Sequence, residues 1–206
     1  MEASEAYRWL MTGSQHSACD RFDAHLIASV VSLALMESVK ESRSLTACVG
    51  LEGASLTALV SETFPHAREV FARLETEESL ERAQDEACLR DLLVRCATAG
   101  SPFQEKLASI VARRAQRPNH LWQDLGLPNR GDLTLLMKRH FERAAAKNQH
   151  DMKWKKFLYR MVCGTEGFTI CTSPVCSECS DYHNCFGAED GEARLHSLEV
   201  LGEHVA

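Results

Sequence analysis

The sequence predicts an all-α fold: a helical bundle with a C-terminal irregular cysteine-rich loop. Apolar residues recur at steps of three and four along most of the chain, which indicates amphipathic helices. No stretch of useful length alternates apolar and polar residues as a strand does. The loop is predicted from four cysteines within residues 171–185, CTSPVCSECSDYHNC. The chain has 206 residues, 45% of them hydrophobic, which suffices for one core.

Two segments carry the clearest helical pattern, residues 23–41 and residues 78–97. Both place their apolar residues on one face and are predicted to be core helices. Gly and Pro remove helix hydrogen bonds or supply turn geometry, and they therefore predict breaks between helices. These breaks fall at residues 49–53, 64–65, 100–102 and 127–131. Asp132 is predicted to cap a further helix that runs to about Lys147.

A helix predicted at residues 152–161 comes directly before the cysteines, and Cys163-Gly164 is expected to end it. Its apolar residues share one face that we expect to pack on the body: Trp154, Phe157, Leu158 and Met161. Its basic residues form a cationic strip, a candidate site for an anion or a partner protein: Lys153, Lys155, Lys156 and Arg160. A docked surface helix with a solvated strip explains the same pattern without any ligand.

Charge is distributed unevenly, although the total is only −6. Residues 1–99 hold 9 Lys and Arg against 16 Asp and Glu, and residues 171–206 hold 1 against 7. Residues 100–170 hold 13 against 6 and are therefore basic. A basic segment suits nucleic acid, an anion or an acidic protein surface, and it equally suits internal pairing with the acidic flanks.

The sequence predicts a cytoplasmic protein. The first fifteen residues lack a basic-then-apolar pattern, and the nearly apolar run from His25 to Met36 is shorter than a bilayer span. Nine cysteines are an odd number, which does not suggest a disulfide framework. Four of them are scattered along predicted helices, where we expect small apolar residues: Cys19, Cys48, Cys88 and Cys96.

The clustered cysteines follow the spacing Cys171-x4-Cys176-x2-Cys179-x5-Cys185 and are predicted to hold a metal site together. Structural zinc sites usually combine two C-x2-C pairs that are separated by a dozen or more residues, and this sequence has no such spacer. One loop can wrap an iron–sulfur cluster and ligate its irons in turn, which fits the spacing better. Zinc ligation and redox or unused thiols remain as alternatives.

Four blocks of the sequence resemble the NifQ family of nitrogen-fixation proteins. They are NHLWQDLGL at 119–127, LLMKRHF at 135–141, DMKWKKFLYRMVC at 151–163, and the cysteine motif followed by Phe186-Gly187. The resemblance covers about residues 117–188, and the cysteine motif shows no departure from the family pattern. The N-terminal half resembles the family only in its helical character.

The resemblance implies a molybdenum carrier without turnover of its own, whose cofactor is an iron–sulfur cluster of the 3Fe-4S or 4Fe-4S type. It implies that the molybdenum is donated for biosynthesis of the iron–molybdenum cofactor of nitrogenase. The implied partners are molybdate or a molybdenum–sulfur species, together with cofactor-assembly proteins, namely the scaffold complex and the nitrogenase iron protein. Soft sulfur ligands suit both iron and reduced molybdenum.

A three-iron cluster needs three cysteines and leaves an open corner at which molybdenum can sit. The fourth cysteine of the loop, Cys163 or a histidine would then cap that corner or remain unused. The matching region contains His120, His140, His150 and His183. A histidine on a helix is more often a core or surface residue than a ligand. Of these four, His140 is the candidate for an additional ligand, because it shares a helix end with a basic cluster.

Residues 1–190 are predicted to form a single helical domain, with residues 191–206 as an acidic tail. Within the domain, residues 1–117 form a helical N-terminal half and residues 118–190 a cluster-binding region, with the cysteine loop at 163–187. The alternative function is a zinc- or Fe–S-stabilised regulatory or nucleic-acid-binding module. An acidic total charge without a helix-turn-helix or basic arm disfavours it, so we expect no nucleic acid and no membrane as partner. An electron-transfer enzyme is disfavoured because no nucleotide-binding glycine motif is present.

Overall fold

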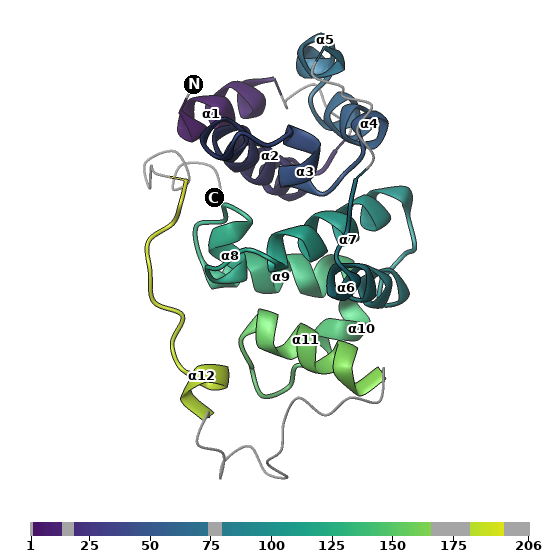
Figure 1. Cartoon of the computed structure of the whole chain (residues 1–206), viewed down its shortest axis with the longest axis vertical. Coiled ribbons are helices and arrows are strands. Elements are labelled where there is room, and N and C mark those ends of the chain that lie inside the picture. The colour runs from purple at the N-terminus through teal and green to yellow at the C-terminus, as the bar shows by residue number, and fades with distance from the viewer. Residues whose placement is uncertain (1, 14–18, 74–79, 166–181, 196–206) are drawn as a thin grey trace.

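The computed structural model describes residues 2–13, 19–73, 80–165 and 182–195, and within these ranges every regular element is a helix (Figure 1). The predicted all-α class is therefore confirmed. The elements are α1 (Ala3–Thr12), α2 (Arg21–Glu41), α3 (Leu45–Val49), α4 (Gly53–Thr63), the 3-10 helix η2 (Pro65–Ala67), α5 (Arg68–Ala72), α6 (Gln84–Arg95), α7 (Pro102–Ala115), α8 (Leu121–Asp124), α9 (Arg130–His140), α10 (Glu142–Ala145), α11 (Trp154–Thr165) and α12 (Tyr182–Phe186).

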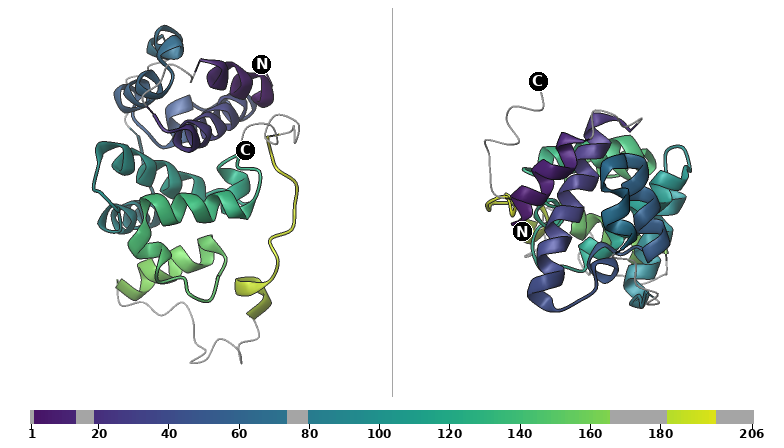
Figure 2. Two further views of the ribbon diagram at one scale, coloured as in Figure 1. Left: turned by 180° about the vertical axis from the view of Figure 1, so that it is seen from behind. Right: turned by 90° about the horizontal axis from the view of Figure 1, so that it is seen from above.

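The helices are stacked in tiers along the long axis of the molecule (Figures 1 and 2). Helices α1 to α5 lie at one end, α6 to α9 form the middle, and α10 to α12 lie at the other end. One hydrophobic core joins the tiers, since a single cluster of buried side chains extends from α1 to α11 and includes Leu195. The site described below lies where the middle tier meets α11 and α12.

Helix α2 is the central core helix and begins two residues before the predicted start. Its N-cap is Asp20, whose side chain accepts a hydrogen bond of 2.8 Å from the backbone N–H of Phe22. By length and composition alone α2 is apolar enough to cross a membrane, but 67% of the qualifying stretch is buried inside the protein. Its apolar character therefore reflects burial between neighbouring helices.

Helices α6 and α7 lie where the sequence predicts helix, although α6 starts later than expected. The predicted helix at residues 78–97 is observed as α6, although it begins only at Gln84, after an irregular stretch. The predicted break at residues 100–102 is confirmed, because α7 begins at Pro102 behind the cap residue Ser101. The Ser101 hydroxyl accepts the N–H of Gln104 at 3.3 Å.

Helix α9 differs from its prediction at both ends. Asn129, and not Asp132, is the N-cap, because the Asn129 side-chain oxygen accepts the N–H of Asp132 at 3.1 Å. The helix then ends at His140 and does not continue to Lys147. Phe141 leaves the helical conformation, with φ −134° and ψ 50°, and its side chain is fully buried. Burial of this ring in the core accounts for the break.

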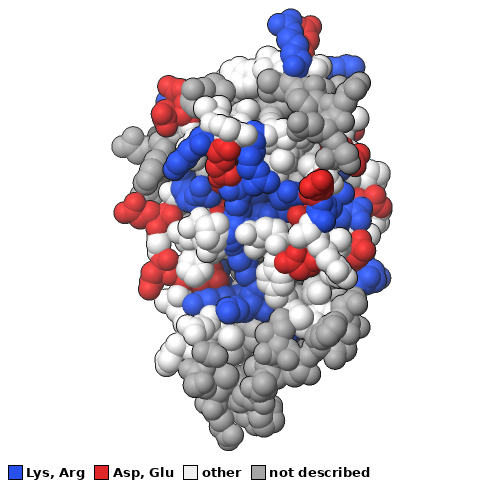
Figure 3. All heavy atoms as spheres, in the orientation of Figure 1, with Lys and Arg blue, Asp and Glu red and all other residues white. Residues whose placement is uncertain are grey.

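The basic middle of the chain pairs largely with acidic residues of the N-terminal half. Its arginines on α7, after α7 and on α9 contact carboxylates on or next to α2 and α6. On one face of the molecule, Figure 3 shows basic and acidic side chains intermixed. Internal charge pairing, one of the two interpretations of the basic segment, therefore accounts for these arginines. The pairs, with N–O distances of 2.9 Å or less, are Arg113–Glu86, Arg114–Glu37, Arg117–Glu41 and Arg139–Asp20.

The predicted cysteine loop at 163–187 is described only at its two ends, and both ends are helical. Helix α11 extends through Cys163 and Gly164 to Thr165, and residues 182–186 form α12. The expectation of irregular structure is therefore wrong at these ends. At the second end, the N–H of Gly187 donates to the carbonyl of His183 at 2.9 Å and closes the last turn of α12.

Residues 187–195, which we call the return segment, run along one side of the molecule from α12 towards the N-terminal tier (Figures 1 and 2). Arg194 binds Glu37 of α2 at 2.8 Å, and the side chain of Leu195 is buried. Leu195 docks on Gly126, which has φ 73° and where an added Cβ would lie 2.8 Å from the Leu195 side chain. Only glycine suits both the conformation and this close approach. The chain after the cysteines is thereby fixed to the body.

Candidate functional site

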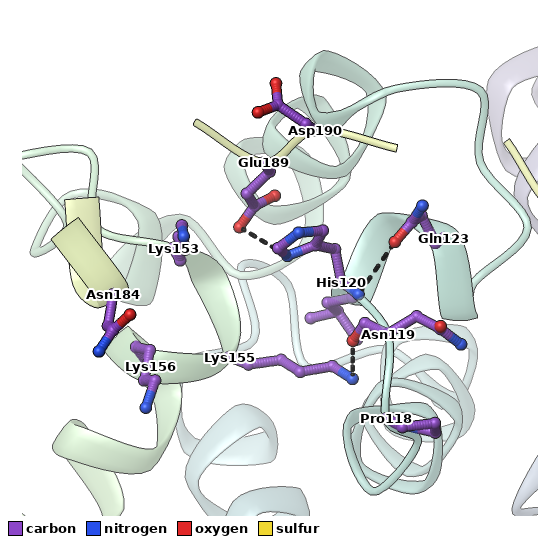
Figure 4. Close-up of a pocket in the computed structure, with 11 residues that line it drawn as sticks. Pro118, Asn119, His120, Gln123, Lys153, Lys155, Lys156, Asn184, Glu189 and Asp190 are labelled. Carbon is purple, nitrogen blue, oxygen red and sulfur yellow. Dashed lines mark hydrogen bonds and ion pairs between the residues drawn. The ribbon is translucent and has the colours of Figure 1, made fainter. Parts of the chain in front are cut away.

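A pocket of about 370 Å³ opens between the start of α8, the start of α11, α12 and the return segment (Figure 4). We call it the lysine pocket, because three of its lining residues are lysines. The remaining lining combines a histidine, side-chain amides, two carboxylates and the apolar residues Pro118 and Leu121. The lining residues are Pro118, Asn119, His120, Leu121, Gln123, Lys153, Lys155, Lys156, Asn184, Glu189 and Asp190.

Helix α11 carries the lysines on a rigid support. The predicted apolar face is confirmed, because Trp154, Phe157 and Leu158 are 2%, 7% and 0% exposed and Met161 is partly buried against the core. The indole N–H of Trp154 donates to the hydroxyl of Thr134 on α9 at 3.2 Å. This anchoring fixes the direction in which the basic side chains leave the helix.

Lys155 turns into the body and does not belong to an exposed strip. Its ammonium donates to the carboxylate of Asp124 at 2.7 Å and to the backbone carbonyls of Arg117 and Asn119. Burial lowers the pKa of Lys155, and its hydrogen bond and ion pair with Asp124 oppose that shift. Three acceptors use all three ammonium protons, so Lys155 has no donor left for a ligand.

Lys153 and Lys156 have different surroundings from Lys155. Among the residues that the structure describes, the Lys153 ammonium makes one long contact, 3.4 Å to the carbonyl of His183. Lys156 is exposed, and it makes no hydrogen bond or ion pair within the part of the chain that the structure describes. Arg160, the fourth residue of the predicted strip, is exposed one turn further along α11 and does not line the pocket. The ammonium groups of Lys153 and Lys156 are therefore the cations that a ligand in the pocket can meet.

Asp124 at the end of α8 connects the pocket to the interior of the protein. Its carboxylate is fully buried and accepts from Asn119 at 2.9 Å, from Lys155 and from Arg194 at 3.2 Å. Arg194 also reaches Glu37, which forms a two-pronged contact with the buried Arg114. We call this set the central charge network, and it consists of Glu37, Arg114, Arg117, Asp124, Lys155 and Arg194. It fixes α11 and the return segment against α2, α7 and α8.

Glu189 is the buried acid of the pocket. Its side chain is 3% exposed, and its two oxygens lie 3.9 Å from Nδ1 of His120 and 3.9 Å from Nε of Arg130 (Figure 4). Its Oε2 atom is buried and receives no hydrogen bond from the described residues. His120 is held in turn by a reciprocal cap with Gln123, whose side-chain oxygen accepts the His120 N–H at 3.1 Å. A buried carboxylate that lacks hydrogen-bond donors destabilises the fold, so its presence in the pocket wall requires an explanation.

Of the predicted cluster ligands, the structure places Cys185 and the additional candidate Cys163. Both are partly buried, one on α12 and one on α11, and the carbonyl of Cys185 accepts the N–H of Lys153 at 2.8 Å. Cys185 thus lies next to the pocket. Cys171, Cys176 and Cys179 lie outside the described residues. Within the ranges described, no group of three or more His, Cys, Asp and Glu side chains is arranged to hold a metal ion.

Three of the four scattered cysteines, Cys48, Cys88 and Cys96, have surroundings that suit small apolar residues. Cys48 on α3 and Cys96 at the end of α6 are buried, and Cys88 on α6 is partly buried. Cys19 differs from its prediction, because it lies in a bend before α2 and not on a helix. Burial raises the pKa of Cys48, and it raises that of Cys19 to about 11. A raised pKa disfavours the thiolate form that binds metals.

His140, the predicted additional ligand, is buried at the end of α9. Its Nε2 lies 2.9 Å from Asp23 of α2, and its ring lies 5.4 Å from that of Phe103. His150 and His183 are exposed, and only His120 of the four named histidines lines the pocket. The sequence pattern indicated no role for Asn119 or Glu189, and it offered His120 only as one of four histidines in the matching region. The block NHLWQDLGL offered a signal for Asn119 and His120, because its polar residues interrupt an otherwise apolar run.

Comparison with known proteins agrees with the family indicated by the motifs. The NifQ family model matches residues 26–187, so the resemblance extends well into the N-terminal half, beyond residues 117–188. Protein NifQ homolog of Sinorhizobium fredii (strain NBRC 101917 / NGR234) is 38% identical over 182 residues, which cover 88% of this chain and 79% of that protein. Protein NifQ of Rhodobacter capsulatus is 33% identical, with 81% and 91% covered.

A third relative matches a shorter region. Protein NifQ of Azotobacter vinelandii is 41% identical over 114 residues, which cover 55% of this chain and 58% of that protein. No solved structure matches the chain. A family match over most of the sequence, with two relatives above 30% identity across most of their length, determines the assignment. The chain belongs to the NifQ family.

Proposed function

We propose that this protein is a cytoplasmic nitrogen-fixation protein that receives molybdenum on an iron–sulfur cluster. It donates the metal for biosynthesis of the iron–molybdenum cofactor of nitrogenase and has no turnover of its own. The observation that carries the proposal is the unbroken cysteine motif inside the region that the NifQ family model matches. Thiolates are the ligands that iron–sulfur clusters use, and they suit reduced molybdenum.

In this proposal the cluster is of the 3Fe-4S or 4Fe-4S type and is held by Cys171, Cys176, Cys179 and Cys185. A set of thiolate donors fits such a cluster chemically. The position of Cys185 beside the pocket, on a helix docked to Lys153, supports its part in the set. Cys163 remains a candidate for an additional ligand. His140 is a weaker one, because its Nε2 is already bonded to Asp23.

The basic residues on and next to α11 are proposed to bind the molybdenum species and the partner proteins. Lys153, Lys156 and Arg160 attract molybdate or a molybdenum–sulfur species, or dock an acidic surface of the scaffold complex or the nitrogenase iron protein. Lys155 contributes only by holding α11 in place, since its ammonium is fully used. The cluster-binding region is residues 118–190 of a single domain formed by residues 1–190, and Arg194 and Leu195 of the acidic tail 191–206 pack on that domain.

Serine substitutions test the cluster ligands. We expect Cys176→Ser and Cys179→Ser to lose iron, acid-labile sulfide and visible charge-transfer absorption, because a hydroxyl is a poor substitute for a thiolate. Cys88→Ser is the matched control, because Cys88 is partly buried on α6, and it should keep all three signals. Unchanged iron and sulfide content in either of the first two variants would contradict the ligand assignment.

A further inference from the structure

We propose that the lysine pocket is a binding site for a tetrahedral dianion, and that molybdate is held there before the metal reaches the cysteines. The identity of the anion rests on the proposed function. The binding chemistry rests on the pocket alone, through its two available lysines, its fixed polar walls and its buried carboxylate.

The two lysines provide the attraction. Lys153 and Lys156 are three residues apart at the start of α11, so they project from the same side of the helix. Figure 4 shows them on one side of the pocket, with His120 and Glu189 on the other. An ammonium group is a compact charge with donors that rotate, which suits a tetrahedral oxyanion better than a planar carboxylate. A dianion between them would pair with both charges.

The walls of the pocket are fixed before any ligand arrives. Asn119 donates its amide to Asp124 at 2.9 Å. Gln123 donates to the carbonyl of Glu192 at 3.0 Å and accepts from the N–H of His120. Because these amides are already paired, they shape the cavity and lose little entropy when a ligand binds. Which ligand the pocket binds therefore depends on Lys153 and Lys156 and on Glu189 opposite them.

Glu189 limits how tightly an anion can bind. Its carboxylate is buried in the wall, and Nδ1 of His120 and Nε of Arg130 each lie 3.9 Å from one of its oxygens. An ionised carboxylate repels a dianion, so the site combines attraction by two lysines with repulsion by one acid. A site that passes its ligand onward must bind it weakly enough to release it. This arrangement therefore suits transient holding.

A metal cation fits the pocket less well than an anion. Three lysines line the cavity, and among the residues described no set of three His, Cys, Asp or Glu side chains converges as a metal site. The second acid of the lining, Asp190, is exposed to solvent. The volume of about 370 Å³ accommodates a small hydrated anion.

The test measures binding of molybdate to the full-length chain that carries Cys176→Ser and Cys179→Ser, so that the cluster does not contribute. Equilibrium dialysis should show saturable binding of about one molybdate per chain. In this background, Lys153→Gln with Lys156→Gln should weaken binding by about tenfold or more, because two charge-assisted hydrogen bonds are lost. The control, Lys138→Gln with Lys147→Gln, removes two exposed lysines outside the pocket and should stay within about twofold of the background protein.

A second variant should change the affinity for molybdate in the opposite direction. Glu189→Gln keeps the size of the side chain and removes its charge, so it should tighten molybdate binding by about fivefold. Sulfate and phosphate share the tetrahedral chemistry and should compete with molybdate, no more tightly than molybdate itself. Sulfate that binds about tenfold more tightly would overturn the assignment to molybdate.

The proposal fails if the chain shows no saturable molybdate binding, or if both lysine pairs weaken it equally. Neither result depends on whether the cysteines hold a cluster. Iron and sulfide analysis of the cysteine variants tests the proposed function separately, so the two failures are distinguishable.

Discussion

Lys155 and Lys156 are adjacent in the sequence, but they have opposite surroundings. Lys155 is partly buried against Asp124, and Lys156 is exposed at the mouth of a pocket. The difference follows from the helix. Lys155 is seven residues before Val162, which is buried, so both lie along the same edge of the apolar face. The position of a lysine relative to the buried face of its helix therefore decides whether its charge serves the fold or a ligand.

The same contrast holds between the two regions that contain these lysines. The central charge network has a buried centre of Glu37, Arg114 and Asp124, and its charges are paired, which makes it a structural unit. The lysine pocket keeps cations at the surface and an incompletely bonded acid in its wall. A segment with 13 Lys and Arg against 6 Asp and Glu is therefore a poor guide to binding until its internal pairs are subtracted.

Removal of one charge from the central network should give the largest loss of stability. Glu37→Gln leaves the fully buried Arg114 without its counter-charge, and we expect the free energy of unfolding to fall by about 3 kcal/mol. Urea denaturation of the parent and variant proteins measures the difference. A loss below about 1 kcal/mol would mean that the network is not the structural unit described here.

The two adjacent lysines should differ in their effect on stability. Lys155→Gln loses charged hydrogen bonds to a buried carboxylate, and we expect a cost of about 2 kcal/mol. Lys156→Gln should change the free energy of unfolding by about 0.5 kcal/mol or less, because the residue is exposed. Thermal or urea unfolding of the matched pair provides the comparison, and equal losses would remove the distinction between the two sites.

The network should also depend on pH. Burial raises the pKa of Glu37, but its hydrogen bond to Arg114 and the nearby arginine charges outweigh burial and hold the pKa below its usual range. Because the folded-state pKa is the lower one, this stabilisation is present above the ordinary Glu pKa of about 4.3. It is lost as the pH falls through the folded-state value.

Unfolding of the parent protein and Glu37→Gln at several pH values isolates this contribution. The difference between the two proteins should be constant above about pH 5 and should shrink on acidification. A difference that grows on acidification would show that the pKa of Glu37 is raised in the folded protein.

The surface cations should affect transfer of molybdenum more than stability. Lys153→Gln with Lys156→Gln should keep the iron content but slow molybdenum transfer at low salt. Added salt should slow the parent protein in the same way, since exposed charges are screened beyond about 10 Å at 0.1 M ionic strength. Equal transfer rates for parent and variant at low salt and equal iron content would assign these lysines to the solvated surface alone.

Much of the fold follows from local sequence. The 3.6-residue pattern located α2, α6 and α11, and Gly and Pro located the breaks between helices. The start of α9 could not be decided in this way, because Asn129 and Asp132 are both good caps. Its end depends on burial of Phe141 in a core built from distant helices, which no local pattern encodes.

The candidate site was only partly predictable for the same reason. The lysines and cysteines stood out by type and spacing. The partner that binds Nε2 of His140 is Asp23, 117 residues away, and the lysine pocket joins residues 118–123, 153–156, 184 and 189–190. Such contacts depend on tertiary packing, so the sequence alone could not separate Lys155 from its neighbours or bring Glu189 to His120.

The central claim is that the cysteine motif of this NifQ family protein carries molybdenum on an iron–sulfur cluster. Its most direct test is anaerobic purification of the full chain from cells supplied with molybdate, followed by analysis of iron, acid-labile sulfide, molybdenum and zinc. We expect the purified protein to contain iron and sulfide together with molybdenum, and Cys176→Ser to lose all three. Zinc alone, with neither iron nor sulfide, would contradict the claim.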